Sequence, residues 1–257
     1  MDFIFLKVLS ISIIQGVMEW VPISSSGLLI VLEEILNMNN KIFNLNLNIT
    51  VHFGSLFAVL FFFSKEITKI FYNRKLLLNI FVATLPIILI GAIFKLSGFI
   101  YILQNTNTVI SATLIFAVIL FLCDQKKVKN KFNKNISYQH AIVIGLAQVA
   151  ALIPGSSRSG VTISAARYLG YSRVDAAKFS FLISIPTIFG ANILNLSDTK
   201  IDYFKDDYYL LIVAFVVSFL ISFYTIKYFL NFLQKFSLNI FVIIRIILGI
   251  YLAIFFI

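Results

Sequence analysis

Charged residues are scarce in this chain: they make up 12% of its 257 residues, whereas 60% of the residues are hydrophobic. The mean hydropathy is +0.97. A soluble domain could reach such values only by burying nearly all of its elements on every side. The shortage of charge therefore excludes an ordinary soluble domain and indicates an integral membrane protein.

Cysteine is nearly absent as well, because Cys123 stands alone. An intramolecular disulfide is therefore excluded, and no cluster of cysteine and histidine offers a zinc site. The apolar start of the chain, MDFIFLKVLSISIIQGVMEWVP, lacks a basic first segment and an A-x-A-like cleavage site. We expect it to belong to the mature protein and not to be a signal peptide.

Neither the net charge nor the apolar motifs of this chain indicate a macromolecular partner. The net charge is +10, but the lysines lie in short segments between apolar runs, where membrane topology explains them, so nucleic acid is not an expected partner. No G-x-x-x-G motif stands out on a clean apolar face. The sequence therefore leaves the oligomeric state open, a homodimer included.

Long apolar runs are what the chain has in abundance. They approach or exceed the roughly 20 residues that a helix needs to cross a bilayer, and they lack the alternation of a barrel strand. The sequence therefore predicts an all-α polytopic membrane protein. Six uninterrupted runs are candidate crossings: 49–64, 77–96, 108–123, 175–195, 208–231 and 239–257.

Two further apolar segments, 3–36 and 139–170, are broken in the middle. Pro22 and a serine run interrupt the first, and Pro154 with Gly155 interrupts the second. Proline and glycine break the backbone hydrogen-bond ladder where a membrane helix tolerates it least. Each segment is therefore predicted to be a re-entrant helical hairpin.

The two broken segments resemble each other at a constant offset of 133 residues. This indicates a duplication within one membrane domain over 1–257, with repeats of about 1–123 and 139–257. Each repeat would hold one hairpin and three crossings, and the odd number of crossings inverts the second copy, as in many transporters. The matching pairs are Gln15 with Gln148, Ser24 with Ser157, Ser26 with Ser159, and Gly27 with Gly160.

Lysine and arginine are concentrated in two of the connecting segments. The segments 64–75 and 124–138 are rich in them and are predicted to be cytoplasmic, whereas 37–48 and 97–107 hold only Lys41 between them. Both termini then fall outside. The first hairpin enters from outside, and the second rises from the cytoplasm to meet it.

The first hairpin carries a carboxamide and a carboxylate at helical spacing. Gln15 and Glu19 are four residues apart and so share one helix face, just before the break at Pro22. A carboxylate at membrane depth costs about 2.5 to 3.5 kcal/mol on insertion scales. It could be a structural partner of Arg158, but intramembrane ionisable residues are functional by default, and we favour a site for a divalent cation or substrate.

The second hairpin contains the stretch ALIPGSSRSGVTISA, which places an arginine in an apolar environment. We expect backbone N–H groups to be free at Gly155 and at the start of the following half-helix. Ser157, Ser159 and Thr162 add hydroxyls, and Arg158 adds a planar fork of donors. Small residues also allow close helix packing, but packing does not require an arginine. These donors predict a phosphate site.

Together the two hairpins suggest a phosphorylated lipid headgroup, with Mg²⁺ or Ca²⁺ between the acid and the phosphates. Two long motifs, QGVMEWVPISSSG and PGSSRSGVT, resemble the signatures of undecaprenyl-diphosphate phosphatases of the bacitracin-resistance type. The resemblance extends through RVDAAKFSFLISIPTIFGA and covers most of the chain. It implies hydrolysis of the C55 isoprenyl diphosphate to its monophosphate at the outer face of the bacterial inner membrane, which recycles the carrier for cell-wall synthesis.

The resemblance also implies roles for individual residues. Gln15 and Glu19 match the acidic motif that holds or acts with the metal. Ser25 matches the serine proposed as nucleophile, with Ser24 and Ser26 beside it as substrate-binding residues. The phosphate-binding loop is matched by Gly155, Ser157, Arg158, Ser159 and Thr162, of which Arg158 is expected to act in catalysis.

One position departs from the family pattern. Family members usually have histidine directly after the serine-run glycine, whereas this chain has Leu28, which cannot take a proton. Glu19 could serve instead by activating either Ser25 or a metal-bound water. His52 is a further candidate from the first crossing, although a lone histidine near a helix end is more often structural, and His140 is a weaker candidate.

Two other functions compete with hydrolysis. Inverted repeats with broken helices suit alternating access, so the chain could instead move a polyprenyl phosphate across the membrane. Phosphate release by the purified protein distinguishes the two. A scaffold without a site would make Glu19 and Arg158 an internal ion pair and would leave the serine clusters unexplained.

Overall fold

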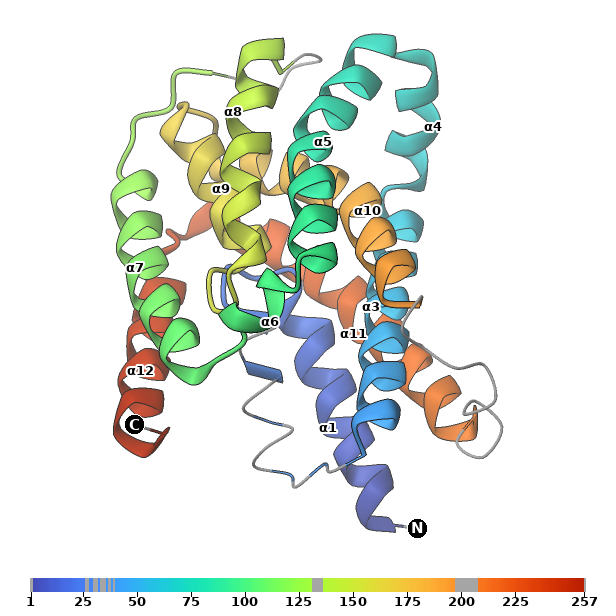
Figure 1. Ribbon diagram of the computed structural model, residues 1–257. Coiled ribbons are helices and arrows are strands. Elements are labelled where there is room, and N and C mark those ends of the chain that lie inside the picture. The colour runs from blue at the N-terminus through green and yellow to red at the C-terminus, as the bar shows by residue number, and fades with distance from the viewer. Residues whose placement is uncertain are drawn as a thin grey trace.

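The computed structural model describes residues 2–25, 28, 29, 32, 36, 38, 40–130, 136–196 and 208–256. Within these ranges the chain is helical and has no named strand; a single bridge joins Asn130 to Tyr171. The prediction of an all-α fold is therefore confirmed. Figure 1 shows the helices gathered into one bundle.

The helices follow the order that the apolar runs predict. The first half contains α1 (Asp2–Met18), α3 (Lys41–Phe62), α4 (Ser64–Tyr72), α5 (Arg74–Leu96), α6 (Phe99–Leu103) and α7 (Thr106–Asp124). The second half contains α8 (Tyr138–Gln148), a 3₁₀ turn (Val149–Leu152), α9 (Arg158–Tyr168), α10 (Arg173–Leu196), α11 (Tyr208–Lys235) and α12 (Asn239–Phe256).

The six predicted crossings correspond to α3, α5, α7, α10, α11 and α12. In the part of the chain that the structure describes, five of these six helices are long and apolar enough to span a membrane, and α12 offers a shorter apolar stretch at Asn239–Phe255. The short helices α4 and α6 were not predicted. They lie in connecting segments, where hydropathy alone gives no helix signal.

Polar side chains fix the start of several helices. At each of these starts the side chain accepts a hydrogen bond from the backbone N–H three residues later, which satisfies one of the donors that a helix leaves unpaired at its first turn. The caps are Asn40 for α3, Asn73 for α5, Asn105 for α7 and Ser137 for α8.

The two broken segments enter the bundle from opposite ends (Figure 1). α1 begins beside the amino terminus, at the end of the bundle that also holds the carboxyl terminus, whereas α8 begins at the other end. α4 and the segment 126–130, which carry many of the lysines, lie at the same end as the start of α8. This common end for the lysines is what the predicted membrane topology requires.

The packing partners of the helices correspond between the two halves. α1 packs against α11 as α8 packs against α5, and α3 contacts α10 while α7 contacts α12. In the predicted duplication α1 corresponds to α8, α3 to α10, α5 to α11 and α7 to α12. Exchanging the two halves therefore converts the α1–α11 contact into the α8–α5 contact, and it maps the α3–α10 and α7–α12 contacts onto themselves. This is the pairing that the predicted duplication requires, although the repeat itself stays a prediction.

Glycine and serine bring α3 very close to α11. A Cβ atom on Gly54 would lie 2.6 Å from the carbonyl oxygen of Phe215, so the two backbones approach as only glycine permits. Ser222 Oγ donates to Ser55 Oγ at 2.9 Å, and Ser218 Oγ donates to the Val51 carbonyl at 2.6 Å. Helices α3 and α11 are therefore in close contact along this stretch and leave no space for a larger side chain at Gly54.

A buried carboxylate joins four helices at the lysine-rich end. Asp124, at the last turn of α7, accepts from Arg167 of α9 at 3.2 Å and from Arg173 of α10 at 2.7 Å. It also accepts from the backbone N–H of Leu238, just before α12, at 3.0 Å. Because the carboxylate has several donors, its burial is compensated. This cluster holds together the end of the bundle that faces away from both termini.

Candidate functional site

The first break places Glu19 directly after the last residue of α1. The backbone N–H of Glu19 still donates to the Gln15 carbonyl at 3.0 Å, so Glu19 continues the last helical turn. The two side chains therefore share a face, as predicted, and Gln15 Nε2 donates to Glu19 Oε2 at 2.9 Å. Glu19 is 7% exposed and Gln15 is fully buried. The buried Gln15 amide therefore fixes the orientation of the Glu19 carboxylate.

The second break ends in a strained residue that starts a helix. Ser157 has a φ of +70°, which is uncommon for any residue other than glycine and costs on the order of 1–3 kcal/mol. Its Oγ accepts from the backbone N–H of Gly160 at 3.1 Å and so caps α9. The first residue of that helix is Arg158, which places its guanidinium at the positive end of the helix dipole.

An ion pair joins the two breaks. Arg158 Nη2 donates to Glu19 Oε1 at 2.8 Å, and the two side chains are 11% and 7% exposed. Arg158 Nη1 donates to the Ser180 carbonyl of α10 at 3.1 Å, and the guanidinium lies 5.7 Å from the centre of the Trp20 ring. The structural partnership of Glu19 and Arg158 is thus present, and it lies beside the other candidate site residues.

The second carboxylate oxygen of Glu19 faces a hydroxyl and an imidazole. Ser25 Oγ donates to Glu19 Oε2 at 3.3 Å, and His52 Nε2 lies 3.7 Å from the same oxygen. His52 Nδ1 is 2.7 Å from the Asn48 carbonyl, which can only accept, so Nδ1 carries a proton. In neutral His52 the lone pair of Nε2 therefore points toward Glu19.

A cavity of about 240 Å³ opens beside these groups. Five of the predicted site residues line it, namely Glu19, Ser25, Ser157, Arg158 and Ser159, and His52 lines it as well. The remaining walls are mainly apolar: Met18, Ile87, Ala151, Leu152, Thr187, Ile188 and Ala191. The described structure thus brings both breaks and α3 together around one hollow.

Other predicted site residues lie outside this cavity. Thr162 Oγ1 is 2.7 Å from Ser180 Oγ and donates to the Arg158 carbonyl at 2.9 Å, because a hydroxyl four residues into a helix reaches back to its first turn. Gly155 packs against the Val109 backbone of α7. Ser24 is buried, and Ser26 falls outside the described residues.

Arg158, which lines the cavity, and Gln15, which contacts Glu19, each have a buried polar atom without a hydrogen-bond partner among the described residues: Arg158 Nε and Gln15 Oε1. One is a donor on a cation and the other is a neutral acceptor. Buried polar groups are normally paired, so unpaired ones mark places where a ligand could bind. The donor suits an anion such as phosphate, and the amide oxygen suits a hard cation.

Arg245 of α12 is a part of this region that the sequence reasoning missed. Its side chain is fully buried, and its guanidinium donates to the carbonyls of Pro22 at 3.2 Å, Gly155 at 2.9 Å and Ser156 at 3.0 Å. It also donates to the Thr113 carbonyl at 3.2 Å. One arginine thus satisfies carbonyls that both breaks leave without a helical partner.

A signal for Arg245 was present in the sequence. It is the single charged residue in the apolar stretch NIFVIIRIILGIYLAIFF, and an ionisable residue within a membrane helix suggests a function by itself. Its ligands are backbone carbonyls, which carry no signature in the sequence.

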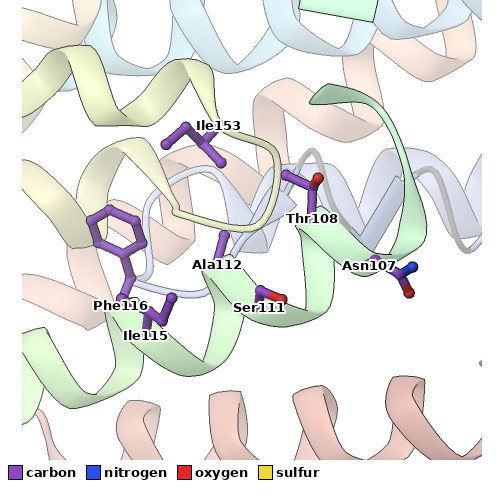
Figure 2. A pocket seen from close by; sticks show the side chains of 7 residues that line it. All are labelled: Asn107, Thr108, Ser111, Ala112, Ile115, Phe116 and Ile153. Carbon is purple, nitrogen blue, oxygen red and sulfur yellow. The ribbon is translucent and has the colours of Figure 1, made fainter. Parts of the chain in front are cut away.

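Another hollow, on α7, lacks ionisable groups. Figure 2 shows Ile153, at the start of the second break, above Ala112, with Ser111 and Thr108 nearer the start of α7. Asn107, Ile115 and Phe116 complete its lining, and its volume is about 330 Å³. Without a cation or a carboxylate it is not a candidate phosphate site.

Comparison with known families identifies the family of this chain. A model of the bacitracin resistance protein BacA family matches residues 8–251. The chain belongs to this family. Its match includes both breaks and all six of the long apolar helices at least in part.

Individual relatives carry the name undecaprenyl-diphosphatase. A protein of Pelagibacter ubique is 40% identical over 208 residues, which are 80% of each chain. One from Teredinibacter turnerae is 41% identical over 73% of this chain and 74% of the relative. One from Halothermothrix orenii is 37% identical over 75% and 74%. The family that the sequence suggested is thereby confirmed.

Replacement of Arg245 tests its role between the two breaks. We expect Arg245→Met to lower the thermal unfolding midpoint of the purified protein in detergent, because buried carbonyls would lose charged donors worth about 1.5–3 kcal/mol each. Arg245→Lys should lose less, since it keeps a charged donor. The exposed Arg74→Met is the matched control. An unchanged midpoint in Arg245→Met would contradict this role.

Proposed function

We propose that this chain hydrolyses undecaprenyl diphosphate to undecaprenyl phosphate and inorganic phosphate. The relatives named undecaprenyl-diphosphatase support this activity. The observation that carries it is the Glu19–Arg158 pair, which lines a cavity with Ser25, Ser157 and Ser159 inside an apolar bundle. Such a cavity combines donors for a phosphate with an environment for a lipid.

The donors around Arg158 bind the terminal phosphate in this proposal. Arg158 keeps one guanidinium nitrogen, Nε, without a partner while Nη2 holds Glu19. Ser157 and Ser159 line the same cavity at the start of α9, where the helix dipole favours an anion. In a site of low dielectric the fixed Arg158 guanidinium stabilises the charge on the transferred phosphoryl group. The Ser159 hydroxyl donates to the Val21 carbonyl at 2.8 Å, and Ser157 Oγ lies 3.2 Å from Ser159 Oγ. These two hydroxyls therefore shape the cavity wall and hold the two breaks together.

Ser25 is the proposed nucleophile, supported by its hydrogen bond to Glu19. Its Oγ attacks the terminal phosphorus, the bond from that phosphorus to the bridging oxygen breaks, and undecaprenyl phosphate leaves. The Ser25 proton passes to Glu19 Oε2. Glu19 then loses this proton to solvent and activates a water that cleaves the phosphoserine. The bond from phosphorus to Oγ breaks, phosphate leaves, and Ser25 Oγ takes the proton that Glu19 removed from the water.

His52 takes the place of the histidine that the family pattern puts at Leu28. It lines the cavity, and its Nε2 lies 3.7 Å from the carboxylate oxygen that accepts from Ser25. The bond of Nδ1 to the Asn48 carbonyl fixes the tautomer and the ring orientation. We assign His52 the role of sharing the proton that Glu19 receives.

The side chains present fit a hard divalent cation, Mg²⁺ or Ca²⁺. Glu19 and the unpartnered Gln15 Oε1 would hold it through oxygen atoms, and with the ion bound His52 Nε2 would take the Ser25 proton in place of Glu19. The described residues contain no group of three or more histidine, cysteine or acidic side chains that could hold a metal, so the phosphates of the substrate would complete the shell, as is usual for Mg²⁺. When bound, such an ion would neutralise charge on the phosphates and make the phosphorus more electrophilic.

The inner membrane is the location that we propose, with the site open toward the periplasm. The helices long enough to span a membrane support a multi-pass protein. The positive-inside rule assigns the end that carries α4 and the segment 126–130 to the cytoplasm, so the end with both termini faces the periplasm (Figure 1).

Loss of the ion pair should abolish turnover. We expect Glu19→Ala and Arg158→Ala each to lower phosphate release from farnesyl or undecaprenyl diphosphate by about 10³-fold, because one removes the base and the other a charged donor. Release is measured with purified protein in detergent and Mg²⁺ or Ca²⁺, beside the exposed control Glu66→Gln. Turnover close to that of the parent in both variants would overturn the proposed function.

The nucleophile is tested by Ser25→Ala. If Ser25 attacks phosphorus, this variant should lose at least about 10³-fold in turnover, and single-turnover mixing of the parent with terminally labelled substrate should leave acid-stable label on the protein. A variant that keeps a tenth or more of the turnover would assign the attack to water instead.

The role of His52 is tested by moving the histidine. We expect His52→Ala to reduce turnover by about 10²-fold, a usual contribution of a general acid or base. Adding Leu28→His should restore part of that loss, because it puts histidine where family members carry it. Full activity in His52→Ala would leave Glu19 as the sole base.

A further inference from the structure

A second cavity lies between α5 and α10 and continues from the phosphate cavity. It has a volume of about 390 Å³, within the range of sites for small ligands. Ile87, Leu152, Thr187 and Ala191 line both cavities. The two hollows therefore meet at a shared wall, one carrying the ionisable groups and the other mainly apolar.

Small residues give this second cavity its width. Gly91 and Ala92 of α5 and Gly190 and Ala191 of α10 all line it. A Cβ atom on Gly190 would lie 3.8 Å from the nearest atom, in Ile88, which is an ordinary van der Waals contact, so a methyl group would fit there but a larger side chain would enter the cavity. The cavity is thus a groove between two helices with little side-chain bulk in its path.

The outer edge of the groove faces the membrane. Ile88 is 38% exposed and Ile193 is 50% exposed, and both line it. Large apolar side chains exposed on a membrane-spanning helix contact lipid. A chain inside the groove would therefore be continuous with the hydrocarbon of the bilayer.

The corresponding contact in the other half of the protein is closed. Under the predicted duplication, α5 and α10 correspond to α11 and α3. There a Cβ atom on Gly54 would lie 2.6 Å from the Phe215 carbonyl oxygen, against 3.8 Å for Gly190. The backbones of α3 and α11 are thus in closer contact beside Gly54 than the helices α5 and α10 are beside Gly190, where the cavity lies.

The length of the groove follows from its position on α5. Ile87 lies at the phosphate cavity, and Lys95 lines only the far part, where its ammonium donates to the Leu194 carbonyl of α10. Eight residues of helix span about 12 Å. The hydrogen bond from Lys95 to Leu194 connects α5 and α10 at the far end of the groove. The groove is therefore bounded along the helix axes, and its opening is the lateral one beside the exposed Ile88 and Ile193.

We propose that the groove between α5 and α10 binds the first isoprene units of the lipid diphosphate. It is the lateral opening through which the diphosphate reaches Glu19 and Arg158 while the rest of the chain stays in the bilayer. This assignment rests on the proposed function. Apolar walls stabilise an isoprenyl chain by keeping it out of water, whereas the shared wall sets its diphosphate beside Arg158.

Filling the groove tests the proposal. We expect Gly190→Leu to raise KM for farnesyl diphosphate by about tenfold or more with kcat nearly unchanged, because apolar contacts are lost while the ionisable groups stay in place. Ala92→Leu fills the same groove from α5 and should act in the same way. Val118→Leu, which adds bulk to an exposed position of α7, is the matched control.

A direct readout uses a farnesyl diphosphate analogue that carries benzophenone at the end of its chain. Irradiation of the parent protein should label residues of α5 and α10, and excess farnesyl diphosphate should suppress the label. Label confined to other helices, together with an unchanged KM in both filling variants, would overturn the groove alone. Absence of phosphate release by the parent protein would instead overturn the proposed function.

Discussion

The ion pair between Glu19 and Arg158 is the interaction on which the site depends. Each charge comes from a different break, and at membrane depth either charge alone would be strongly unfavourable. The pair therefore fixes the two breaks against each other. Ser25 approaches from the first break and Ser157 from the second, so their positions around one cavity follow from this contact.

A broken helix in a membrane leaves carbonyls without partners, and Arg245 is the solution in this chain. Its guanidinium donates to carbonyls of Pro22, Gly155 and Ser156, and it lies on α12, outside both hairpins. The peptide group is planar and trans, so a carbonyl held toward Arg245 turns the N–H of the same peptide to the opposite side. For Ser156 that N–H belongs to Ser157, which lines the phosphate cavity. The arginine thus helps to orient the start of α9.

The sequence predicted local features better than it predicted contacts between distant segments. Apolar length was sufficient for the long helices, and the spacing of Gln15 and Glu19 was sufficient for their shared face, because both depend on helix geometry. Spacing placed Thr162 beside phosphate, but in the helix its hydroxyl reaches back to the Arg158 carbonyl. His52 could be named only as a candidate, since its approach to Glu19 depends on how α3 packs against the first hairpin.

The two oxygens of the Glu19 carboxylate have separate surroundings, which reconciles the structural and the catalytic interpretations of this residue. Oε1 is held by Arg158 at 2.8 Å. Oε2 receives Gln15 and Ser25 and faces His52. A group that served only as half of an ion pair would not need a hydroxyl and an imidazole at its other oxygen. Because Oε1 anchors the carboxylate, Oε2 is held in place for proton transfer, and the ion pair is a condition of the chemistry.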